Sequence, residues 1–451
     1  MNVPLSLPAT DIGEPPFPKR GYAQFVVLVL MLVYTVSFLD RQILSLLSES
    51  VRADLNISDT QLGTLQGLSF AVFYTGLGIP MGMLADRVHR RTLIIVGLIL
   101  WSIATALCGM ASSYSGLFLA RMLVGVGEAA LAPAAYSIIS DYFPRQSRAR
   151  ALSIYTSGIF VGAGLAYILG GAILPLADRI ALVLQEYGVQ RTDWQVAFFG
   201  AALPGVVLPF LLLLVREPMR REKAGTSHSL TDGWRYVLSR WQLYATICIA
   251  TGFMSATNYG VWAWMPALFQ RVHGWSAAEF GYSFGLVLLI AGPLGMLVGG
   301  YLADRYGGRT SLKVALRLSG GALLLMLPAA VLAPLMSDAT LTMTLLVVQT
   351  FIVAVPVTLG SVMLQLATPN ECRGLVIAIY IMTNNIIGLT LGPGVAPFLS
   401  DSVFRDEGMI GSGIAIQTLI FLPLAGLPLL WLSRQEGLII LSVPAPELAT
   451  A

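Results

Sequence analysis

One short pattern occurs twice in this chain, once in each half. The sequence Gly-x-Leu-Ala-Asp-Arg first appears at Gly82–Arg87 and returns at Gly300–Arg305, with further arginines behind each copy. Each copy lies between two long apolar runs, so each is expected to be a tight, charged loop between two membrane helices. A duplicated membrane half predicts two related helical bundles that share a central interface.

The composition indicates that the bilayer is the solvent of this chain. Hydrophobic residues make up 56% of it, charged residues make up 11%, and the mean hydropathy is +0.75. A soluble protein carries about a quarter charged residues. The three cysteines (Cys108, Cys248 and Cys372) are scattered over apolar runs. They form no disulfide framework and no metal-ligand spacing, and we expect no metal site and no cofactor.

Twelve apolar runs are each long enough for a membrane helix, which needs roughly 20 apolar residues. The first six lie at about 21–47, 61–85, 92–112, 114–140, 149–176 and 194–215, and the last six at about 241–270, 277–303, 311–334, 340–367, 373–400 and 410–433. The sequence therefore predicts an all-α integral membrane protein of twelve helices in two six-helix bundles. Its expected parts are a tail (1–20), a bundle (21–215), a linker (216–240), a second bundle (241–433) and a tail (434–451).

The duplication extends beyond the charged loop. Pro144 and the basic residues behind it, leading to Tyr155, align with Pro369 and the segment leading to Tyr380. Gly158-x-x-x-Gly162 in the fifth run likewise parallels Gly388-x-x-x-Gly392 in the eleventh. Sequence motifs that recur at corresponding positions indicate two homologous halves.

The placement of lysine and arginine predicts the orientation in the membrane. If the N-terminus is inside, basic residues on the inner side of the membrane outnumber those on the outer side by about four to one. Cytoplasmic loops are the ones that carry such an excess. Both termini are therefore expected in the cytoplasm of a bacterial inner membrane. The linker 216–240 places Trp234, Val237, Leu238 and Trp241 at helical spacing, which suits an amphipathic helix on the membrane surface.

These residues resemble the major facilitator superfamily. The duplicated loop is similar to its signature between the second and third spans and between the eighth and ninth. The segment Arg121–Glu128 is similar to its fourth-span motif. Within the superfamily, Phe38-Leu39-Asp40-Arg41, Gly125-Val126-Gly127-Glu128-Ala129 and Gly162–Tyr167 resemble the spinster family. The resemblance implies export of a lysophospholipid or sphingolipid, with protons as the coupling ion.

Four ionisable side chains lie inside apolar runs of the first half: Asp40, Arg41, Arg121 and Glu128. Charges at this depth are costly and usually face a cavity or a partner. Arg121 and Glu128 are seven residues apart, two helical turns, so they share one helix face. We expect all four to form one network, with Asp40 and Glu128 carrying protons. A static network that only fixes helix packing is the alternative.

The arginines are the expected anchors of an anionic substrate, because a guanidinium is a planar fork of donors suited to phosphate or carboxylate. The second half contains no charge at comparable depth, only polar and aromatic residues. A cavity that is charged on one wall and apolar on the other suits an amphiphile. The expected substrate-binding residues are Arg41, Arg121, Tyr74, Asn258, Tyr259 and Asn384.

The two charged loops are expected to act as a conformational gate. Their residues would latch onto neighbouring helix ends on the cytoplasmic side in the outward-facing state and touch no substrate. The predicted gate residues are Asp86, Arg87, Arg90, Arg91, Asp304, Arg305 and Arg309.

The sequence thus favours a secondary transporter that works by alternating access. It contains no H-E-x-x-H, no G-x-S-x-G and no Walker loop, which argues against an intramembrane enzyme and against direct drive by ATP. A lysolipid-like amphiphile is the first expectation for the substrate. A small organic-anion (sugar-acid) symporter and a multidrug proton antiporter remain open. The expected partners are this substrate, protons and membrane lipid, with no nucleic acid, and we expect a monomer.

Overall fold

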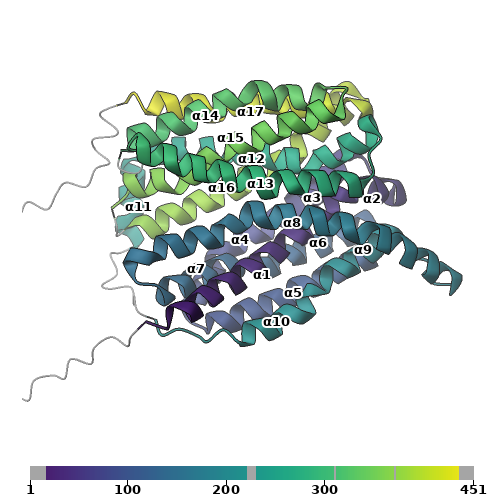
Figure 1. The fold of residues 1–451 in the computed structure, drawn as a ribbon, viewed down its shortest axis with the longest axis horizontal. Coiled ribbons are helices and arrows are strands. Elements are labelled where there is room, and N and C mark those ends of the chain that lie inside the picture. The colour runs from purple at the N-terminus through teal and green to yellow at the C-terminus, as the bar shows by residue number, and fades with distance from the viewer. Residues whose placement is uncertain (1–16, 221–229, 309–310, 370–371, 436–451) are drawn as a thin grey trace, which may run out of the picture.

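The computed structural model describes residues 17–220, 230–308, 311–369 and 372–435, and throughout these ranges the chain forms helices and no strand (Figure 1). The long helices run roughly parallel to one another. The two halves of the chain form adjacent parts of one bundle, with the first half lower and the second half upper in the view of Figure 1.

The first half forms six passages, some of them broken into two helices. The second passage is broken at Gly67, the fourth at Ala129 and Ala130, and the sixth at Leu203. The helices are α1 (Arg20–Leu46), the short α2 (Ser48–Leu55), α3 (Asp59–Gln66), α4 (Leu68–Ala85), α5 (Arg90–Met110), α6 (Tyr114–Glu128), α7 (Leu131–Tyr142), α8 (Arg145–Glu186), α9 (Asp193–Ala202) and α10 (Pro204–Leu213).

The second half begins with a short helix and continues with six long ones. These are α11 (Leu230–Ser239), α12 (Trp241–His273), α13 (Ala277–Arg305), α14 (Leu312–Leu332), α15 (Ala339–Ala367), α16 (Arg373–Phe398) and α17 (Ile410–Leu432). On α11 and at the start of α12, Trp234, Leu238 and Trp241 are exposed while Val237 is buried. This pattern fits the predicted amphipathic segment; residues 221–229 of the predicted linker lie outside the described residues.

Eleven passages among the described residues are long and apolar enough to cross a membrane. The twelfth predicted passage is α12, which has 33 residues and falls outside that set. It carries Thr251, Ser255, Thr257 and Asn258 near its middle, and most of its residues are buried in the bundle. A helix surrounded by protein does not have to be apolar on every face, so α12 completes the twelve-helix fold without a strong hydropathy signal.

The two halves repeat the same packing. The first helix of each half packs along the fifth, α1 on α8 and α12 on α16. In each pair a glycine admits a tyrosine ring: a methyl group at Gly158 would lie 3.1 Å from the ring of Tyr34, and one at Gly388 would lie 3.1 Å from the ring of Tyr259. The halves are therefore related in structure as well as in sequence.

Helix α8 is longer than its apolar run predicted. The sequence suggested an end near residue 176, whereas the helix continues to Glu186 and has 42 residues. Residues 177–186 include Asp178 and Arg179 and so lowered the apolar signal. They nevertheless contain alanine, leucine and glutamate, which are strong helix formers.

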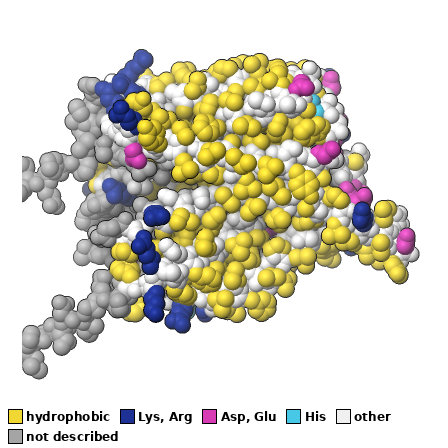
Figure 2. Space-filling view, in the orientation of Figure 1, with side chains coloured by type: hydrophobic (Ala, Val, Ile, Leu, Met, Phe, Trp, Pro, Cys, Tyr) yellow, Lys and Arg dark blue, Asp and Glu magenta, His cyan; other side chains and the backbone are white. Residues whose placement is uncertain are grey.

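The two ends of the bundle differ in charge. We call the end where α1 begins and α17 ends the terminal side, and the end with α2 and α3 the far side (Figure 1). Lysine and arginine side chains gather on the terminal side, and the far side shows mainly acidic ones (Figure 2). This asymmetry is the one that the loop sequences predicted.

The halves meet closely in the far part of the bundle. Between α8 and α13, a methyl group at Gly164 would lie 2.7 Å from the carbonyl oxygen of Gly285, and one at Gly285 would lie 2.6 Å from that of Gly164. Between α4 and α16, a methyl group at Gly67 would overlap the carbonyl oxygen of Leu389. Only glycine allows backbones to approach this closely.

The halves separate toward the terminal side. Residues 76–84 of α4 include no buried residue, although nine residues cover every face of a helix. On α16, Val376 is the only buried residue between residues 373 and 387, while six of the next ten are buried. The interface between these two helices is therefore closed on the far side and open on the terminal side.

Candidate functional site: a charged cluster beneath the far-side seal

The centre of the site is an ion pair between α1 and the end of α6. The Arg41 guanidinium donates to one carboxylate oxygen of Glu128, Oε2, through Nε at 2.9 Å and also through Nη2. The Glu128 side chain is fully buried, and the Arg41 side chain is 10% exposed. The other oxygen of Glu128, Oε1, is buried and has no hydrogen-bond partner. Half of the carboxylate is thus available for a proton or a ligand.

Aromatic rings hold the Arg41 guanidinium in place. Its central carbon lies 4.5 Å from the ring centre of Phe70, 4.8 Å from Tyr74 and 5.3 Å from Phe38. Such stacking is worth about 0.5–2 kcal/mol for each favourable pair. The sequence named Tyr74 as a binding residue, and the structure places it directly against Arg41. Phe38 and Phe70 were not predicted as binding residues, because a phenylalanine in an apolar run does not stand out from its neighbours.

Asp40 and Arg121 lie next to this pair but do not form an ion pair with each other. Arg121, only 1% exposed, donates from Nη1 to the backbone carbonyl of Asp40 at 2.9 Å and from Nε to that of Leu65 at 3.4 Å. The Asp40 carboxyl is buried near Thr105, and its Oδ1 has no partner. Arg121 therefore braces α6 against α1 and α3, and only Arg41 reaches the site as a partly exposed cation.

The facing wall comes from the second half and carries no charge. The Asn384 amide oxygen accepts from Ser255 at 2.8 Å, and its nitrogen donates to Thr251 at 3.1 Å and to the Tyr380 carbonyl at 3.0 Å. Both ends of the amide are engaged within the second half. Asn384 thus ties α12 to α16 in this conformation.

Tyrosines from both halves surround the partly exposed face of Arg41. Tyr34 is stacked on Tyr155 with ring centres 5.0 Å apart, and Tyr136 meets Tyr155 edge to face at 5.5 Å. Tyr259 of α12 interacts electrostatically with both Arg41 and Tyr74. Asn258, the preceding residue, is partly exposed. Of these residues the sequence analysis predicted only Tyr74, Asn258 and Tyr259 as binding residues. For Tyr155 the repeat was an available clue, because Tyr155 corresponds to Tyr380.

The first charged loop is anchored inside its own half. The buried Arg90 guanidinium pairs with Asp141, donates to Glu217 at 2.8 Å and donates to the carbonyl of Pro218 at 2.9 Å. The backbone N–H of Arg91 donates to the second oxygen of Glu217 at 2.9 Å. These contacts fasten the chain that leaves α10 to the N-terminus of α5. In this conformation the first charged loop is therefore paired with the end of α7, through Asp141, and with the start of the linker.

The contact at Glu217 makes a pH-dependent contribution to stability. Burial raises the pKa of Glu217, but the hydrogen bonds from the Arg91 backbone and the Arg90 guanidinium outweigh this and leave the pKa below its usual value of 4.5. A lowered pKa means that the contact stabilises the folded state above pH 4.5 and that this contribution is lost as the pH falls through the lowered value. Hydrogen bonds to charged groups contribute about 1.5–3 kcal/mol.

We accordingly expect Glu217→Gln to lower the melting temperature at neutral pH and to have little effect once the pH is below the lowered pKa of Glu217. Thermal unfolding of the purified protein at a series of pH values measures this. Glu186→Gln, at the exposed end of α8, is the control. An equal loss of stability at both pH values would contradict the assignment.

The other predicted gate residues lie at the surface on the terminal side. Asp86 is 78% exposed on its side chain and reaches Arg220 at 3.9 Å. Arg87, Asp304 and Arg305 are also exposed. Arg309 lies outside the described residues. None of the described loop residues lies at the Arg41 site.

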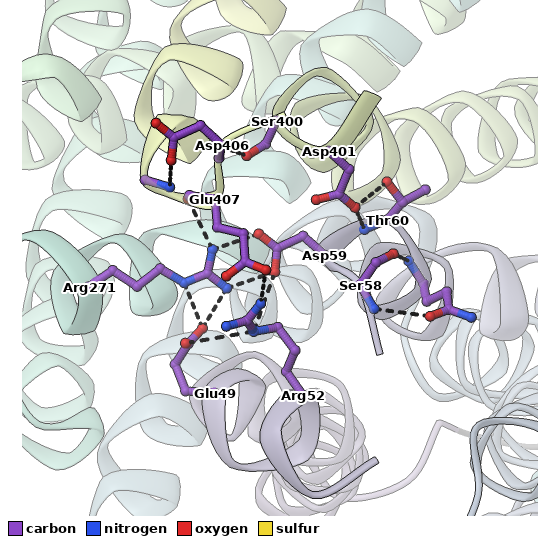
Figure 3. A network of polar contacts seen from close by, with 12 residues as sticks. Glu49, Arg52, Ser58, Asp59, Thr60, Arg271, Ser400, Asp401, Asp406 and Glu407 are labelled. Carbon is purple, nitrogen blue, oxygen red and sulfur yellow. Dashed lines mark hydrogen bonds and ion pairs between the residues drawn. The ribbon is translucent and has the colours of Figure 1, made fainter. Parts of the chain in front are cut away.

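A second charged cluster, which the sequence analysis did not identify, joins the halves on the far side (Figure 3). Arg271 at the end of α12 forms a two-fold contact with Asp59 of α3, at 2.6 and 2.7 Å. It also donates to Glu49 of α2, at 2.7 and 2.9 Å. Asp59 is completely buried, and the Arg271 side chain is 12% exposed. This arginine therefore holds two carboxylates of the opposite half.

Two further contacts extend this far-side cluster. Arg52 of α2 reaches Glu407, which precedes α17, at 2.6 Å. Thr60 donates its backbone N–H and its hydroxyl to Asp401, each at 2.7 Å. Every one of these bonds crosses between the halves (Figure 3). They can exist only while the far side is closed. Together with the glycine contacts in the far part of the bundle, they hold the two halves against each other.

Comparison with known proteins identifies the family of this chain. The sequence profile described as Major Facilitator Superfamily matches residues 30–393. The chain belongs to the major facilitator superfamily. An efflux pump of this superfamily from Mycolicibacterium smegmatis is 31% identical over 438 residues, which cover 96% of this chain and 97% of that protein.

The spinster proteins are relatives within the superfamily. Protein spinster of Drosophila melanogaster is 27% identical over 296 residues, which cover 62% of this chain and 46% of that longer protein. A crystal structure of a bacterial homologue of the human lysosomal transporter Spinster matches with a TM-score of 0.81 and 26% identity. The match covers 95% of this chain and all of the other, and that protein is inward-facing and unoccupied.

The charged groups of this superfamily member are not arranged as metal ligands. Among the described residues, no three His, Cys, Asp or Glu side chains gather at one point. The central site instead offers one partly exposed guanidinium, two buried carboxyl groups and phenol rings. Such a set can bind an anion and exchange protons.

Proposed function

We propose that this protein is a proton-coupled secondary transporter that works by alternating access and exports an amphiphile with an anionic head group, such as a lysophospholipid or a related sphingolipid. The observation that carries the proposal is the Arg41–Glu128 pair, whose cation is partly exposed while its carboxylate is fully buried. Asp40, buried beside it, is the second proposed proton site.

Competition for Arg41 couples the substrate to the proton. A carboxylate in the membrane interior keeps its charge only beside a positive partner. When an anionic head group binds the Arg41 guanidinium, Glu128 loses that partner and must take up a proton. The substrate and the proton are thus carried together in the same direction, and when the proton leaves again, Glu128 reclaims Arg41 and displaces the substrate on that side. The exchange needs one carboxyl group and one arginine, and the arginine never loses its own charge.

The shape and charge of the surroundings support an amphiphile. The head group would meet Arg41 on the wall of the first half. The remainder of the molecule would lie along tyrosine rings and the uncharged wall that α12 and α16 form. The charge asymmetry of Figure 2 supports the terminal side as the cytoplasmic side. In that orientation the structure is inward-facing, and a substrate enters from the cytoplasm or the inner leaflet.

The similarity to an efflux pump supports a second candidate, a proton-coupled exporter of hydrophobic drugs. A cationic drug would pair with Glu128 or Asp40 and leave Arg41 without a role. The two candidates therefore differ in the effect of Arg41 on substrate binding. A symporter of small sugar acids would use Arg41 but has little use for an uncharged facing wall.

The test is transport by purified protein in proteoliposomes, with labelled lysophosphatidic acid and a pH gradient of either sign. Because the substrate and the proton move together, we expect the wild type to export the lysolipid when the vesicle interior is the more acidic side and not when the gradient is reversed. The rate in Glu128→Gln should be at least about tenfold lower, equivalent to about 1.4 kcal/mol. Glu186→Gln is the matched control on the exposed end of α8.

Each alternative has its own signature. Gradient-driven movement of ethidium but not of the lysolipid would favour the drug exporter, and uptake of gluconate would favour the sugar-acid symporter. Export that depends on neither the gradient nor Glu128 would reduce the charged cluster to a packing element.

A further inference from the structure

The end of α8 projects from the bundle on the far side. A helix of 42 residues is about 63 Å long at 1.5 Å per residue, and the hydrocarbon core of a bilayer is about 30 Å thick. Its last turns extend past the neighbouring helices in Figure 1. We call residues 176–187 the α8 arm. The arm has no role in the Arg41 site or in the far-side cluster.

One face of the arm is apolar and uncovered. Leu176, Ile180, Val183 and Tyr187 are spaced by four, three and four residues, so they form a single stripe. Their exposed fractions are 58%, 40%, 51% and 81%. Exposed apolar residues that line up along one face of a helix mark a contact surface, whereas scattered ones do not.

The other faces of the arm show which way the stripe points. Ala177 and Ala181 are buried on the side where α8 packs on α9. Asp178, Arg179, Gln185 and Glu186 occupy the remaining side and are exposed, and Leu182 is a single exposed apolar residue among them. The arm thus has a face toward its own bundle, a polar face, and an apolar face that no described residue covers.

The stripe continues the membrane surface of α8. One turn and two turns before Leu176, Ala172 and Leu169 are exposed on the same face. Those positions belong to the passage that is apolar enough to cross the membrane. Hydrophobic side chains likewise run without a break from the bundle onto the projecting end in Figure 2. Because the face that meets lipid passes directly into the stripe, lipid is the occupant that this continuity supports.

We infer that the α8 arm lies in the head-group layer of the far leaflet, with its stripe against lipid and its polar face toward water. A helix with a narrow apolar face and a charged opposite face is suited to that boundary. Pro175 at the base of the arm allows the helix to bend there, because proline removes one bond of the helical ladder. The arm would fix the depth of α8 in the membrane. Helix α8 in turn forms one side of the close contact with α13.

The inference is tested with spin labels on the full-length protein in vesicles of phosphatidylethanolamine and phosphatidylglycerol. Single cysteines at positions 176, 180 and 183 probe the stripe, and single cysteines at 178 and 185 probe the polar face. Native Cys108, Cys248 and Cys372 are first replaced by alanine. Collision with oxygen, which concentrates in lipid, is compared with collision with a water-soluble nickel chelate.

We expect a several-fold higher ratio of oxygen to nickel collisions at the stripe than at the polar face. Equal, nickel-dominated values at both faces would show that the arm stands free in water and would overturn the inference. Low accessibility to both agents at the stripe, or spin–spin broadening there, would overturn it in favour of a protein partner or a second copy. Neither result depends on which substrate is transported.

Discussion

Replacing Arg271 with alanine is expected to shift the protein out of the far-side-closed conformation. The change removes the closer of the two arginines that Glu49 and the fully buried Asp59 share, and leaves them only Arg52, at 4.0 and 3.8 Å. Removing one partner of a buried ion pair costs about 3–5 kcal/mol, and the partial exposure of this cluster lowers that figure. Opening the far side lets water reach both carboxylates. The penalty therefore falls on the closed state, and its population should fall by about tenfold or more.

The shift is measured through Leu46, which is buried at the far end of α1 and whose carbonyl accepts from Gln270 of the opposite half. With Leu46→Cys in a background without native cysteines, a membrane-impermeant maleimide should label the Arg271→Ala protein at least several-fold faster. Arg179→Ala removes an exposed arginine of the same side and should leave the rate unchanged. Unchanged labelling in Arg271→Ala would mean that the glycine contacts, together with the remaining Arg52–Glu407 and Thr60–Asp401 contacts, hold the far side closed without Arg271.

Separating Arg41 from Glu128 is expected to produce the largest loss of function. Arg41→Met leaves a buried carboxyl group with no cation beside it, and Glu128→Gln leaves the cation without its counter-ion. Each single change should lower both stability and transport. The double variant, Arg41→Met with Glu128→Gln, removes both charges and should recover much of the stability, because neutral side chains of similar volume avoid the desolvation cost.

Transport by the double variant separates the two interpretations of the pair. If the pair couples the proton to the substrate, the double variant melts near the wild-type temperature and carries no gradient-driven flux. If the pair only fixes helix packing, recovered stability brings recovered flux. Melting temperature and proteoliposome flux are measured on the same preparations, so a protein that fails to fold is not mistaken for one that fails to transport.

The sequence predicted the fold well because the bilayer imposes simple rules. Long apolar runs must be helices, and a repeated loop must join corresponding helices. The predictions missed where those rules stop applying. Helix α8 continues to Glu186 because helix propensity, rather than apolarity, sets its length beyond the membrane. The passage predicted at about 241–270 is present as α12, although it is less apolar than its neighbours because protein surrounds it.

The site was predictable where a residue type was unusual for its surroundings. Asp40, Arg41, Arg121 and Glu128 stand out in apolar runs, and the structure gathers all four. Their separate roles did not follow from the sequence, since only packing shows that Arg121 bonds to backbone carbonyls while Arg41 meets Glu128. The far-side cluster gave no signal at all. Arg271, Asp59 and Glu49 lie where polar residues are ordinary, and 212 residues separate Arg271 from Asp59.

The glycine contacts between the halves involve different residues from those proposed to bind the substrate. Where α8 crosses α13 and where Gly67 meets α16, a main-chain carbonyl oxygen lies against the glycine, and every sequence supplies that group in the same form. Contacts between a Cα–H group and a carbonyl oxygen are individually weak, about 0.5–1 kcal/mol each, so they can be broken and remade. The side chains proposed to bind the substrate line a different part of the interface. Related proteins could therefore differ in the residues that line the substrate site and still keep the same contacts between the halves, provided that the glycines are retained.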